Sequence, residues 1–229
     1  MSDISDKTVT IVGGTGDQGY GLALRWASAG FRVIIGSREP ARAQEAADRV
    51  KSLVGAAARV EGYENLHAVT LAPLVVLSVP FTAQVKTLVA LRGAWKAGQV
   101  LIDLTVPLEA SVGGAASKVL GVWAGSAAQQ AAANVPAGIE VAAAFHNVSA
   151  HALQHLDTPV DCDAIVCADS PETRKLLRPW VEAIPGCRYV DGGKLENARI
   201  VESITALLVG INRRYKIKLS GIRVTGLPQ

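Results

Sequence analysis

A glycine-rich loop between an apolar run and a helical pattern constrains the fold of this chain more than any other feature. The run Thr8–Val12 leads directly into "GGTGDQG", and "DQGYGLALRWASAG" has the apolar spacing of a helix that ends at Gly30. Gly14, Gly16 and Gly19 follow the order G-x-G-x-x-G at this junction. The first glycine permits a tight turn, the second lets the backbone approach a pyrophosphate, and the third lets helix and strand pack closely. The sequence therefore predicts a nucleotide-binding loop.

Apolar runs of strand length alternate with helical patterns along the rest of the chain, as in parallel sheets with helical crossovers. Further strands are expected at 31–35, 59–62, 74–79, 100–104, 139–147, 163–168 and 187–193, and further helices at 39–54, 82–93, 126–134, 170–184 and 195–215. We expect an α/β fold with a doubly wound, mainly parallel sheet of the Rossmann type, and residues 1–229 as a single domain. Pro179 is expected to kink or shorten its helix.

Composition and charge exclude several classes of protein. A net charge of +3 over 229 residues is too small to indicate a nucleic-acid-binding surface. No apolar run is long and charge-free enough to span a membrane, and the N-terminal "MSDISDK" lacks the apolar core of a signal peptide. We therefore expect a cytoplasmic enzyme whose partners are small molecules. The last helix has apolar residues on more than one side, which favours a homo-oligomer.

The cysteines and histidines do not form a metal-binding pattern. Cys162, Cys167 and Cys187 occur without C-x-x-C spacing, so we expect buried reduced thiols, with a disulfide or metal site as the weaker alternative. His151 and His155 are spaced i, i+4 but lack the Glu of H-E-x-x-H. The sequence therefore predicts no metal site.

The second strand ends without the acid that usually holds the adenosine ribose of NAD. Ser37 and Arg38 occupy this place. A hydroxyl and a guanidinium are donors that suit a 2′-phosphate, which a carboxylate would repel. Thr15 in the loop and Arg42 in the next helix are placed to join the same pocket. We predict NADP rather than NAD, the alternative being that Arg38 is an ordinary surface charge beside Glu39.

Two X-Pro steps shape the region where the nicotinamide ring is expected. The segments "SVPF" at 78–81 and "LTVP" at 104–107 follow the fourth and fifth strands, and proline forces extended backbone before it. Ligands of a doubly wound sheet lie beyond the carboxyl ends of its strands. The predicted walls of a dry slot for a flat ring include Ser78, Val79, Pro80, Phe81 and Val106.

A proton donor for carbonyl reduction is harder to place. The chain has no Tyr-x-x-x-Lys pair. His146, followed by Asn147, stands at the end of the sixth strand and is the candidate catalytic residue, the alternative being a structural histidine. This sparse acid–base inventory favours a second redox ring as the hydride acceptor.

Four segments together resemble a known family. "GGTGDQGYGLALRWASAGFRVIIGSREPARAQEAA", "SVPF", "AFHNVSAHAL" and "GGKLENARIVESITALL" are similar, in this order and spacing, to the NADPH-dependent reductases of the deazaflavin coenzyme F-420. The resemblance implies reversible hydride transfer between C4 of the nicotinamide and C5 of the deazaflavin, with the two rings stacked. It also implies a homodimer.

The resemblance assigns roles to residues in both halves of the chain. Thr15, Ser37 and Arg38 would hold the 2′-phosphate, and the loop residues Asp17 and Gln18 would contact the same nucleotide. Residues 108–229 would be a C-terminal elaboration that completes the deazaflavin pocket. The residues implied to line that pocket or meet the phosphate-bearing tail are Pro80, His146, Asn147, Val148, Gly192, Gly193 and Arg199.

Two alternative functions follow from the same residues. The nucleotide half is also similar to the oxidoreductase domains of metalloreductases, which use an ordinary flavin. The alternative enzyme is therefore an NADPH-dependent flavin (FMN or FAD) reductase or ferric reductase. A redox sensor that binds NADP and reports to a protein partner without turnover is the alternative of another class. The apolar walls at 78–81 and 104–107 favour an enzyme over a sensor.

Overall fold

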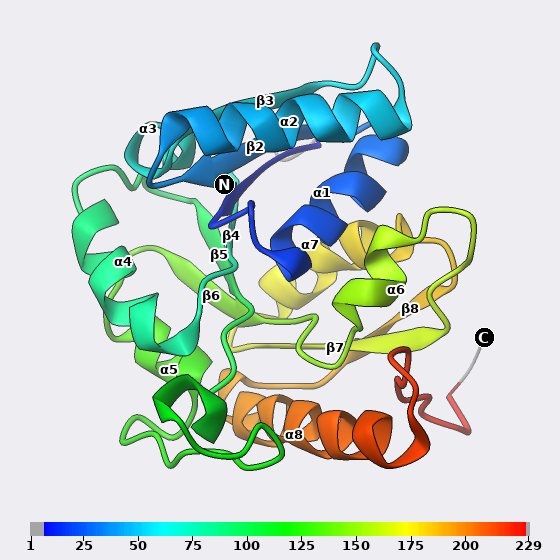
Figure 1. Cartoon of the computed structure of the whole chain (residues 1–229). Coiled ribbons are helices and arrows are strands. Elements are labelled where there is room, and N and C mark those ends of the chain that lie inside the picture. Colours follow the sequence, from blue (N-terminus) through cyan, green and yellow to red (C-terminus); the bar gives the residue numbers. More distant parts are fainter. Residues whose placement is uncertain (1–6, 228–229) are drawn as a thin grey trace.

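The computed structural model describes residues 7–227, in which eight strands form one sheet of order β3-β2-β1-β4-β5-β6-β7-β8 (Figure 1). Residues 1–6, which hold most of the N-terminal segment "MSDISDK", and residues 228–229 lie outside the described residues. Neighbouring strands are parallel except β6 and β7, which pair antiparallel. The doubly wound, mainly parallel sheet is therefore confirmed. The strands are β1 (Thr8–Val12), β2 (Arg32–Ser37), β3 (Val60–Glu64), β4 (Leu74–Leu77), β5 (Val100–Asp103), β6 (Glu140–Ala143), β7 (Cys162–Ala168) and β8 (Cys187–Asp191).

Helices cover both faces of the sheet, and each face has its own hydrophobic core. The first core receives α1 (Asp17–Ser28), α2 (Pro40–Val54), α6 (Ala150–Gln154) and α7 (Pro171–Glu182), and the second receives α3 (Asn65–Val69), α4 (Gln84–Leu91), α5 (Ala127–Ala132) and α8 (Ala198–Tyr215). Side chains alternate between the cores along a strand, since Leu74 and Val76 join the first and Val75 and Leu77 the second.

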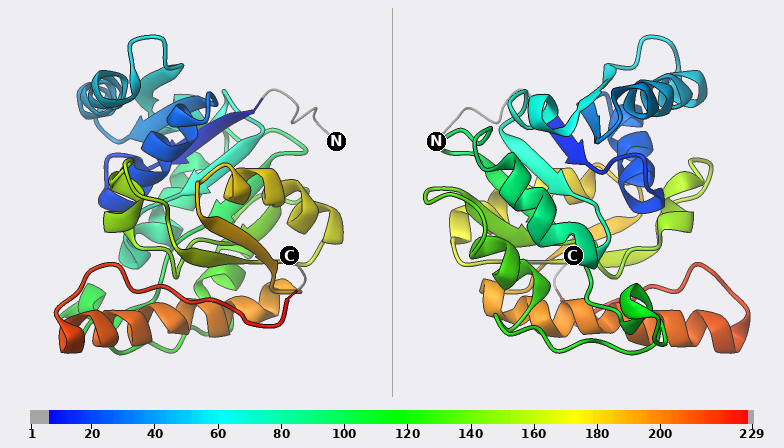
Figure 2. Two further views of the ribbon diagram at one scale, coloured as in Figure 1. Left: turned by 90° about the vertical axis from the view of Figure 1, so that its right-hand side faces the viewer. Right: turned by 60° about the vertical axis from the view of Figure 1, so that its left-hand side comes forward.

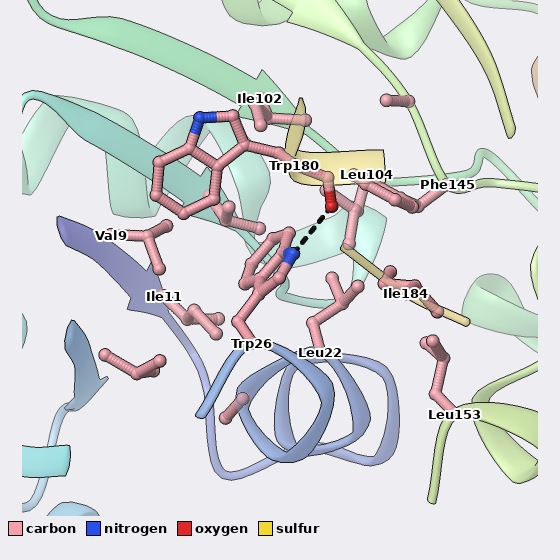
Figure 3. Close-up of a cluster of buried hydrophobic side chains, with 14 of the residues drawn as sticks. Val9, Ile11, Leu22, Trp26, Ile102, Leu104, Phe145, Leu153, Trp180 and Ile184 are labelled. Carbon is pink, nitrogen blue, oxygen red and sulfur yellow. Dashed lines mark hydrogen bonds between the residues drawn. The ribbon is translucent and has the colours of Figure 1, made fainter. Parts of the chain in front are cut away.

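Trp26 lies at the centre of the first core (Figure 3). Its ring packs edge to face on Phe145 and Trp180, with centroids 5.8 and 5.6 Å apart, and its indole N–H donates to the Trp180 carbonyl oxygen at 2.8 Å. Trp180 in turn packs on Phe31 with centroids 4.8 Å apart. These aromatic contacts fix α1 against α7 and against the turn after β6.

The predicted elements agree with the structure in type and order, but several ends differ. The strand expected at 139–147 ends at Ala143, so His146 lies in a turn after the strand and not at its end. The strands expected at 74–79 and 187–193 end at Leu77 and Asp191.

Two helices of one turn, α3 and α6, were not expected, because five residues carry too little periodicity to reveal a helix. The helix containing Pro179 is not shortened there, since α7 continues to Glu182. Burial of Trp180 and Val181 directly after the proline holds the last turn in place.

Cys162, Cys167 and Cys187 are free and buried, as predicted.

The chain after α8 turns back and runs alongside the helix (Figure 2). In this segment the Ile222 carbonyl oxygen accepts a hydrogen bond from the Asp163 N–H of β7 at 2.9 Å. Between residues 7 and 227, none of the helices combines the length and apolar character needed to cross a bilayer.

Candidate active site

The glycine loop is tightly closed on one side and open on the other. Gly13 has a φ of +73°, and a Cβ at Gly14 would lie 2.9 Å from the Ile11 carbonyl oxygen. A Cβ at Gly19 would lie 2.9 Å from the Gly14 Cα. At Gly16, by contrast, a Cβ would meet nothing nearer than the Gly13 oxygen at 3.6 Å. Gly16 is therefore not needed for packing, and its lack of a side chain keeps the backbone accessible to a ligand.

The first turn of α1 offers hydrogen-bond donors to that ligand. Gly16 is the N-cap and has no side chain to accept bonds from the first N–H groups of the helix. The N–H groups of Asp17, Gln18 and Gly19 therefore remain available for an anion at a helix start of positive potential. The loop also lies beside β2, because the Gly14 N–H donates to the Gly36 carbonyl oxygen at 3.0 Å.

Arg38, at the end of β2, has no side-chain partner in the described part of the chain. Ser37 is buried, and its hydroxyl accepts a hydrogen bond from the Glu39 N–H at 3.2 Å. Arg38 is exposed, and its side chain has no hydrogen bond or ion pair with any other part of the described chain. The Glu39 carboxylate instead pairs with Arg42 at 3.6 Å, where both side chains are exposed. Arg38 is therefore free to bind an anion, and Thr15 of the glycine loop is half-buried.

The two predicted walls lie side by side at the carboxyl edge of the sheet. The Ser78 N–H donates to the Val12 carbonyl oxygen at 2.9 Å, which ties the segment after β4 to the glycine loop. The Leu104 N–H donates to the Leu77 carbonyl oxygen at 3.1 Å, which places the segment after β5 alongside. Half-buried along this edge are Ser78, Val79, Phe81 and Val106, next to exposed Pro80.

A sharp turn after β6 closes the other side of the edge. Phe145 has a φ of +64°, a conformation that is rare for a bulky residue and recurs at functional sites. The Gln18 side-chain amide donates to the Phe145 and Val148 carbonyl oxygens at 3.2 and 3.1 Å. His146, inside this turn, is 6% exposed and accepts a hydrogen bond at its carbonyl oxygen from the Thr205 hydroxyl of α8 at 2.8 Å. The glycine loop and the His146 turn are thus physically joined.

His146 belongs to a buried cluster of ionisable groups. Side-chain oxygens of Asp103, at the end of β5, and of Glu202, on α8, lie with a His146 ring nitrogen within 4.8 Å of one another. Neither ring nitrogen has a hydrogen-bond partner in the part of the chain that the structure describes. Burial raises the pKa of Asp103 to about 7 and that of Glu202 to about 7, and it lowers the pKa of His146 to about 4. His146 is therefore a neutral imidazole at pH 7.

Other predicted residues lie apart from this cluster. The Asn147 side-chain amide donates to the Asp163 carbonyl oxygen of β7 at 2.6 Å. Val148 is buried in the first core. Gly192 and Gly193, after β8, lie beside Ala168, whose N–H donates to the Gly193 carbonyl oxygen at 3.0 Å.

The Gly192–Gly193 turn lies next to Ala168 of β7. Ala168 pairs with Ala142, which is one residue before the end of β6. Arg199 is exposed in the first turn of α8, three residues before Glu202. The structure therefore gathers the nucleotide loop, the two walls and His146, and Arg199 lies one helical turn from the His146 cluster.

Sequence reasoning missed Asp103, Glu202 and Gln84, which contacts Asp103. A signal for two of them exists in retrospect. Asp103 is an acid that ends the apolar run "VLID", and Glu202 interrupts an otherwise apolar side of the helix in "ARIVESITALL". An acid at either position is buried if the surrounding residues form the predicted strand and helix. Buried acids with shifted pKa values often belong to functional sites. Nothing in the spacing indicated that they would meet.

Comparison with known proteins agrees with this geometry. A family profile described as "NADP oxidoreductase coenzyme F-420-dependent" matches residues 8–107. The chain is 45% identical over 231 residues to the F-420-dependent NADP reductase of Methanothermobacter thermautotrophicus, covering 100% of this chain and 99% of that protein. It is 30% identical to a metalloreductase of Rattus norvegicus, covering 86% of this chain and 36% of that protein. A crystal structure from Arthrobacter sp. has a TM-score of 0.79 at 19% identity, covering 96% and 99% of the two chains.

The fold and the glycine loop define a dinucleotide-binding protein of the Rossmann class. Strand order β3-β2-β1-β4-β5-β6 is the order of that class, and the loop lies at the point where the order reverses between β1 and β4. Within this class, full-length identity decides the family. The chain belongs to the F-420-dependent NADP reductases.

Proposed function

We propose that this protein transfers a hydride reversibly between NADP(H) and the deazaflavin coenzyme F-420. The observation that carries the proposal is the similarity to F-420-dependent NADP reductases over the full chain, which includes the segments beyond the nucleotide half. The shorter coverage of the metalloreductase gives no comparable support for a flavin. A cytoplasmic location, as expected from the sequence, is part of the same proposal.

NADP would bind along the carboxyl edge between β1 and β4. The open face at Gly16 and the donors at the start of α1 suit the pyrophosphate. Arg38, which has no partner in the rest of the described chain, suits the 2′-phosphate together with Ser37 and Thr15. Arg42 would add to this pocket by leaving Glu39 and binding the 2′-phosphate. The exposed ion pair between Arg42 and Glu39 contributes about 1 kcal/mol or less, so little stability is lost when it breaks.

The deazaflavin would lie opposite the nicotinamide, between the walls that follow β4 and β5 and the His146 turn. When both cofactors are bound, NADPH supplies the hydride and F-420 accepts it. The residues of this chain would hold the two rings in contact and exclude water, because hydride transfer depends on near-attack geometry. His146, 6% exposed, would lie in the wall of this pocket as the candidate catalytic residue, with its unpartnered ring nitrogens buried behind the surface.

Residues 108–229 would complete the second pocket, with Val148 and the backbone of Asn147 behind the ring. Gly192, Gly193 and Arg199 would meet the phosphate-bearing tail of F-420 rather than its ring, because they lie toward the start of α8. Within this proposal the tail therefore runs along α8, and the ring lies near Thr205.

We also infer a homodimer formed through α8. Large apolar side chains are exposed on this helix and on the irregular segment before α5, which lies beside it in Figures 1 and 2, and a patch of this kind is typical of an interface. The residues concerned are Val112, Trp123, Ile200, Leu207 and Tyr215, which are 57 to 104% exposed.

The direct test is NADPH oxidation by the purified protein with F-420, FMN and FAD in parallel, and with NADH as a control. We expect turnover with NADPH and F-420 and little with the flavins or with NADH. Turnover with a flavin alone would identify a flavin reductase. Binding of NADPH without turnover on any acceptor would identify a sensor, and either result would refute the proposal.

A further inference from the structure

The cluster of Asp103, His146 and Glu202 contains two carboxylates and no cation. Asp103 is 0% exposed and Glu202 is 1% exposed, and their side-chain oxygens lie within 4.8 Å of each other and of His146. Within residues 7–227 neither carboxylate forms an ion pair with a lysine or arginine. Two ionised carboxylates at this depth would repel each other and lose their hydration without compensation.

The hydrogen-bond donors around the two carboxylates are uncharged, and they bond Glu202 more strongly than Asp103. Glu202 accepts two backbone hydrogen bonds, from the Ala127 N–H at 2.9 Å and the Ala128 N–H at 3.0 Å, one to each oxygen. Both oxygens of Glu202 are thus stabilised in the ionised form.

Asp103 receives weaker hydrogen bonds than Glu202. The Thr105 hydroxyl donates to it at 2.9 Å. The Gln84 amide nitrogen lies 3.2 Å from each of its oxygens, but its two hydrogens have nearer acceptors in Thr105 Oγ1 at 2.7 Å and the Ala127 carbonyl oxygen at 2.8 Å. A proton within the cluster therefore belongs on Asp103 rather than on Glu202.

We propose that Asp103 and Glu202 hold one proton between them beside His146, so that the three groups carry a single negative charge and the imidazole stays neutral. Asp103 and Glu202 are then positioning residues that act through His146. The shared proton is a property of the protein alone, and only its importance for turnover rests on the proposed function.

The groups that face the cluster from neighbouring elements agree with this assignment. The charge of Glu202 also acts on Cys167 of β7, and burial raises the pKa of this cysteine to about 12, so it stays a neutral thiol. From α4 and α5 the cluster receives the neutral donors Gln84, Ala127 and Ala128. No neighbouring cation replaces the proton in the described part of the chain.

Infrared spectroscopy of the protein without cofactors tests the shared proton. At pH 7 we expect the band of a protonated carboxylic acid, and we expect its loss in Asp103→Asn, because Glu202 keeps its two backbone hydrogen bonds and stays ionised. Glu196→Gln, an exposed acid just before α8, is the matched control and should keep the band. Absence of the band from the unmodified protein, or its persistence in Asp103→Asn, would overturn the proposal.

Two measurements on the unmodified protein remain decisive if the variants do not fold. In protein labelled with ¹³C-histidine, the His146 resonance should stay that of a neutral imidazole from about pH 5.5 to 8. It can be assigned by replacing the exposed His67, His151 and His155 one at a time. An imidazolium at pH 7 would contradict the shared proton. So would a stoichiometric divalent metal found by elemental analysis, because a cation would then balance the charges instead.

Turnover provides a separate readout of positioning. Glu202→Gln should lower kcat with F-420 by about 10- to 100-fold, leave the KM for NADPH unchanged and shift the pH profile, since it removes the negative charge beside His146. An unchanged kcat and pH profile would remove the positioning role. If the unmodified protein does not reduce F-420, the proposed function fails while the spectroscopic results still decide the shared proton.

Discussion

Arg38 carries the nucleotide choice at the scale of single residues. Its guanidinium is exposed at the end of β2 and has no partner in the described chain, although Glu39 is the next residue. Glu39 pairs with Arg42 one helical turn later, so the ordinary surface pair that would occupy Arg38 does not form. An arginine left free beside a buried serine and a glycine loop is arranged for a phosphate.

Arg38→Ala should weaken NADPH binding by about 10- to 100-fold, since hydrogen bonds to a charged group contribute about 1.5 to 3 kcal/mol. NADH, which lacks the 2′-phosphate, should bind as before. Arg92→Ala, an exposed arginine at the end of α4, is the control and should change neither affinity. Fluorescence titration with both nucleotides checks this, and an equal loss for NADPH and NADH would contradict the phosphate assignment.

Substitution by valine should mainly affect nucleotide binding at Gly16 and mainly affect stability at Gly14. Gly16→Val should abolish nucleotide binding and change the free energy of unfolding by about 0.5 kcal/mol or less, because a Cβ at this exposed position meets nothing nearer than 3.6 Å. Gly14→Val should instead destabilise the fold by about 1 to 3 kcal/mol, because its Cβ would lie 2.9 Å from a backbone oxygen. Urea unfolding with NADPH titration compares them, and a Gly16→Val protein that still binds NADPH would refute the assignment.

At the scale of elements, a buried acid joins β7, β8 and the segment after α8. The Asp163 side chain is 0% exposed and accepts hydrogen bonds from Arg188 at 2.7 and 2.9 Å, from Arg223 at 2.8 Å and from the Val224 N–H at 2.7 Å. Burial alone would raise the pKa of Asp163, but these bonds lower it to about 2. The ionised carboxylate therefore stabilises the fold.

Asp163→Asn should lower the free energy of unfolding by about 2 kcal/mol at pH 7. Because the folded pKa lies below the ordinary value of 3.8, this stabilisation is complete above about pH 4 and is lost as the pH falls toward 2. The difference between the two proteins should therefore shrink between pH 4 and pH 2. Asp161→Asn, whose side chain is 88% exposed, is the control and should cost about 0.5 kcal/mol or less. Unfolding curves with a pH-independent difference would contradict this assignment.

The long elements were predictable because their patterns are local. The strand Thr8–Val12 was predicted with the bounds that the structure gives. The helices expected from 126 and from 170 begin after Ser126 and Ser170, and each serine hydroxyl accepts a bond from an N–H three residues later. The helix α6 was not predicted, because it is held by long-range bonds. The buried guanidinium of Arg25 on α1 donates to carbonyl oxygens in and after α6, including Leu153 at 2.9 Å, and no local pattern encodes such a contact.

The same reasoning explains the gaps in the predicted site. The glycine loop and Arg38 follow directly from their neighbours in sequence. The cluster of Asp103, His146 and Glu202 depends on how three distant segments meet. Its members could be listed as acids or histidines, but their encounter is a property of the tertiary fold.

At the scale of the whole molecule, the exposed apolar surface on α8 predicts the assembly. Leu207→Arg should convert a dimer into a monomer, because a charge in the middle of an apolar interface is costly to bury. Leu53→Arg is the matched control: Leu53 is 63% exposed on α2 and Leu207 is 61% exposed, so the two differ in place rather than in exposure. Light scattering after size-exclusion chromatography gives the mass. A monomeric unmodified protein, or a dimeric Leu207→Arg protein, would contradict this interface.

The whole-molecule account rests on direct transfer between two cofactors held at one edge of the sheet. The measurement that tests it most directly uses NADPH carrying deuterium at C4, prepared separately as each of the two stereoisomers, with oxidised F-420 in ordinary water. Mass spectrometry of the reduced coenzyme should find deuterium at C5 from one stereoisomer and none from the other. Reduced coenzyme without deuterium from either stereoisomer would contradict hydride transfer between the two rings.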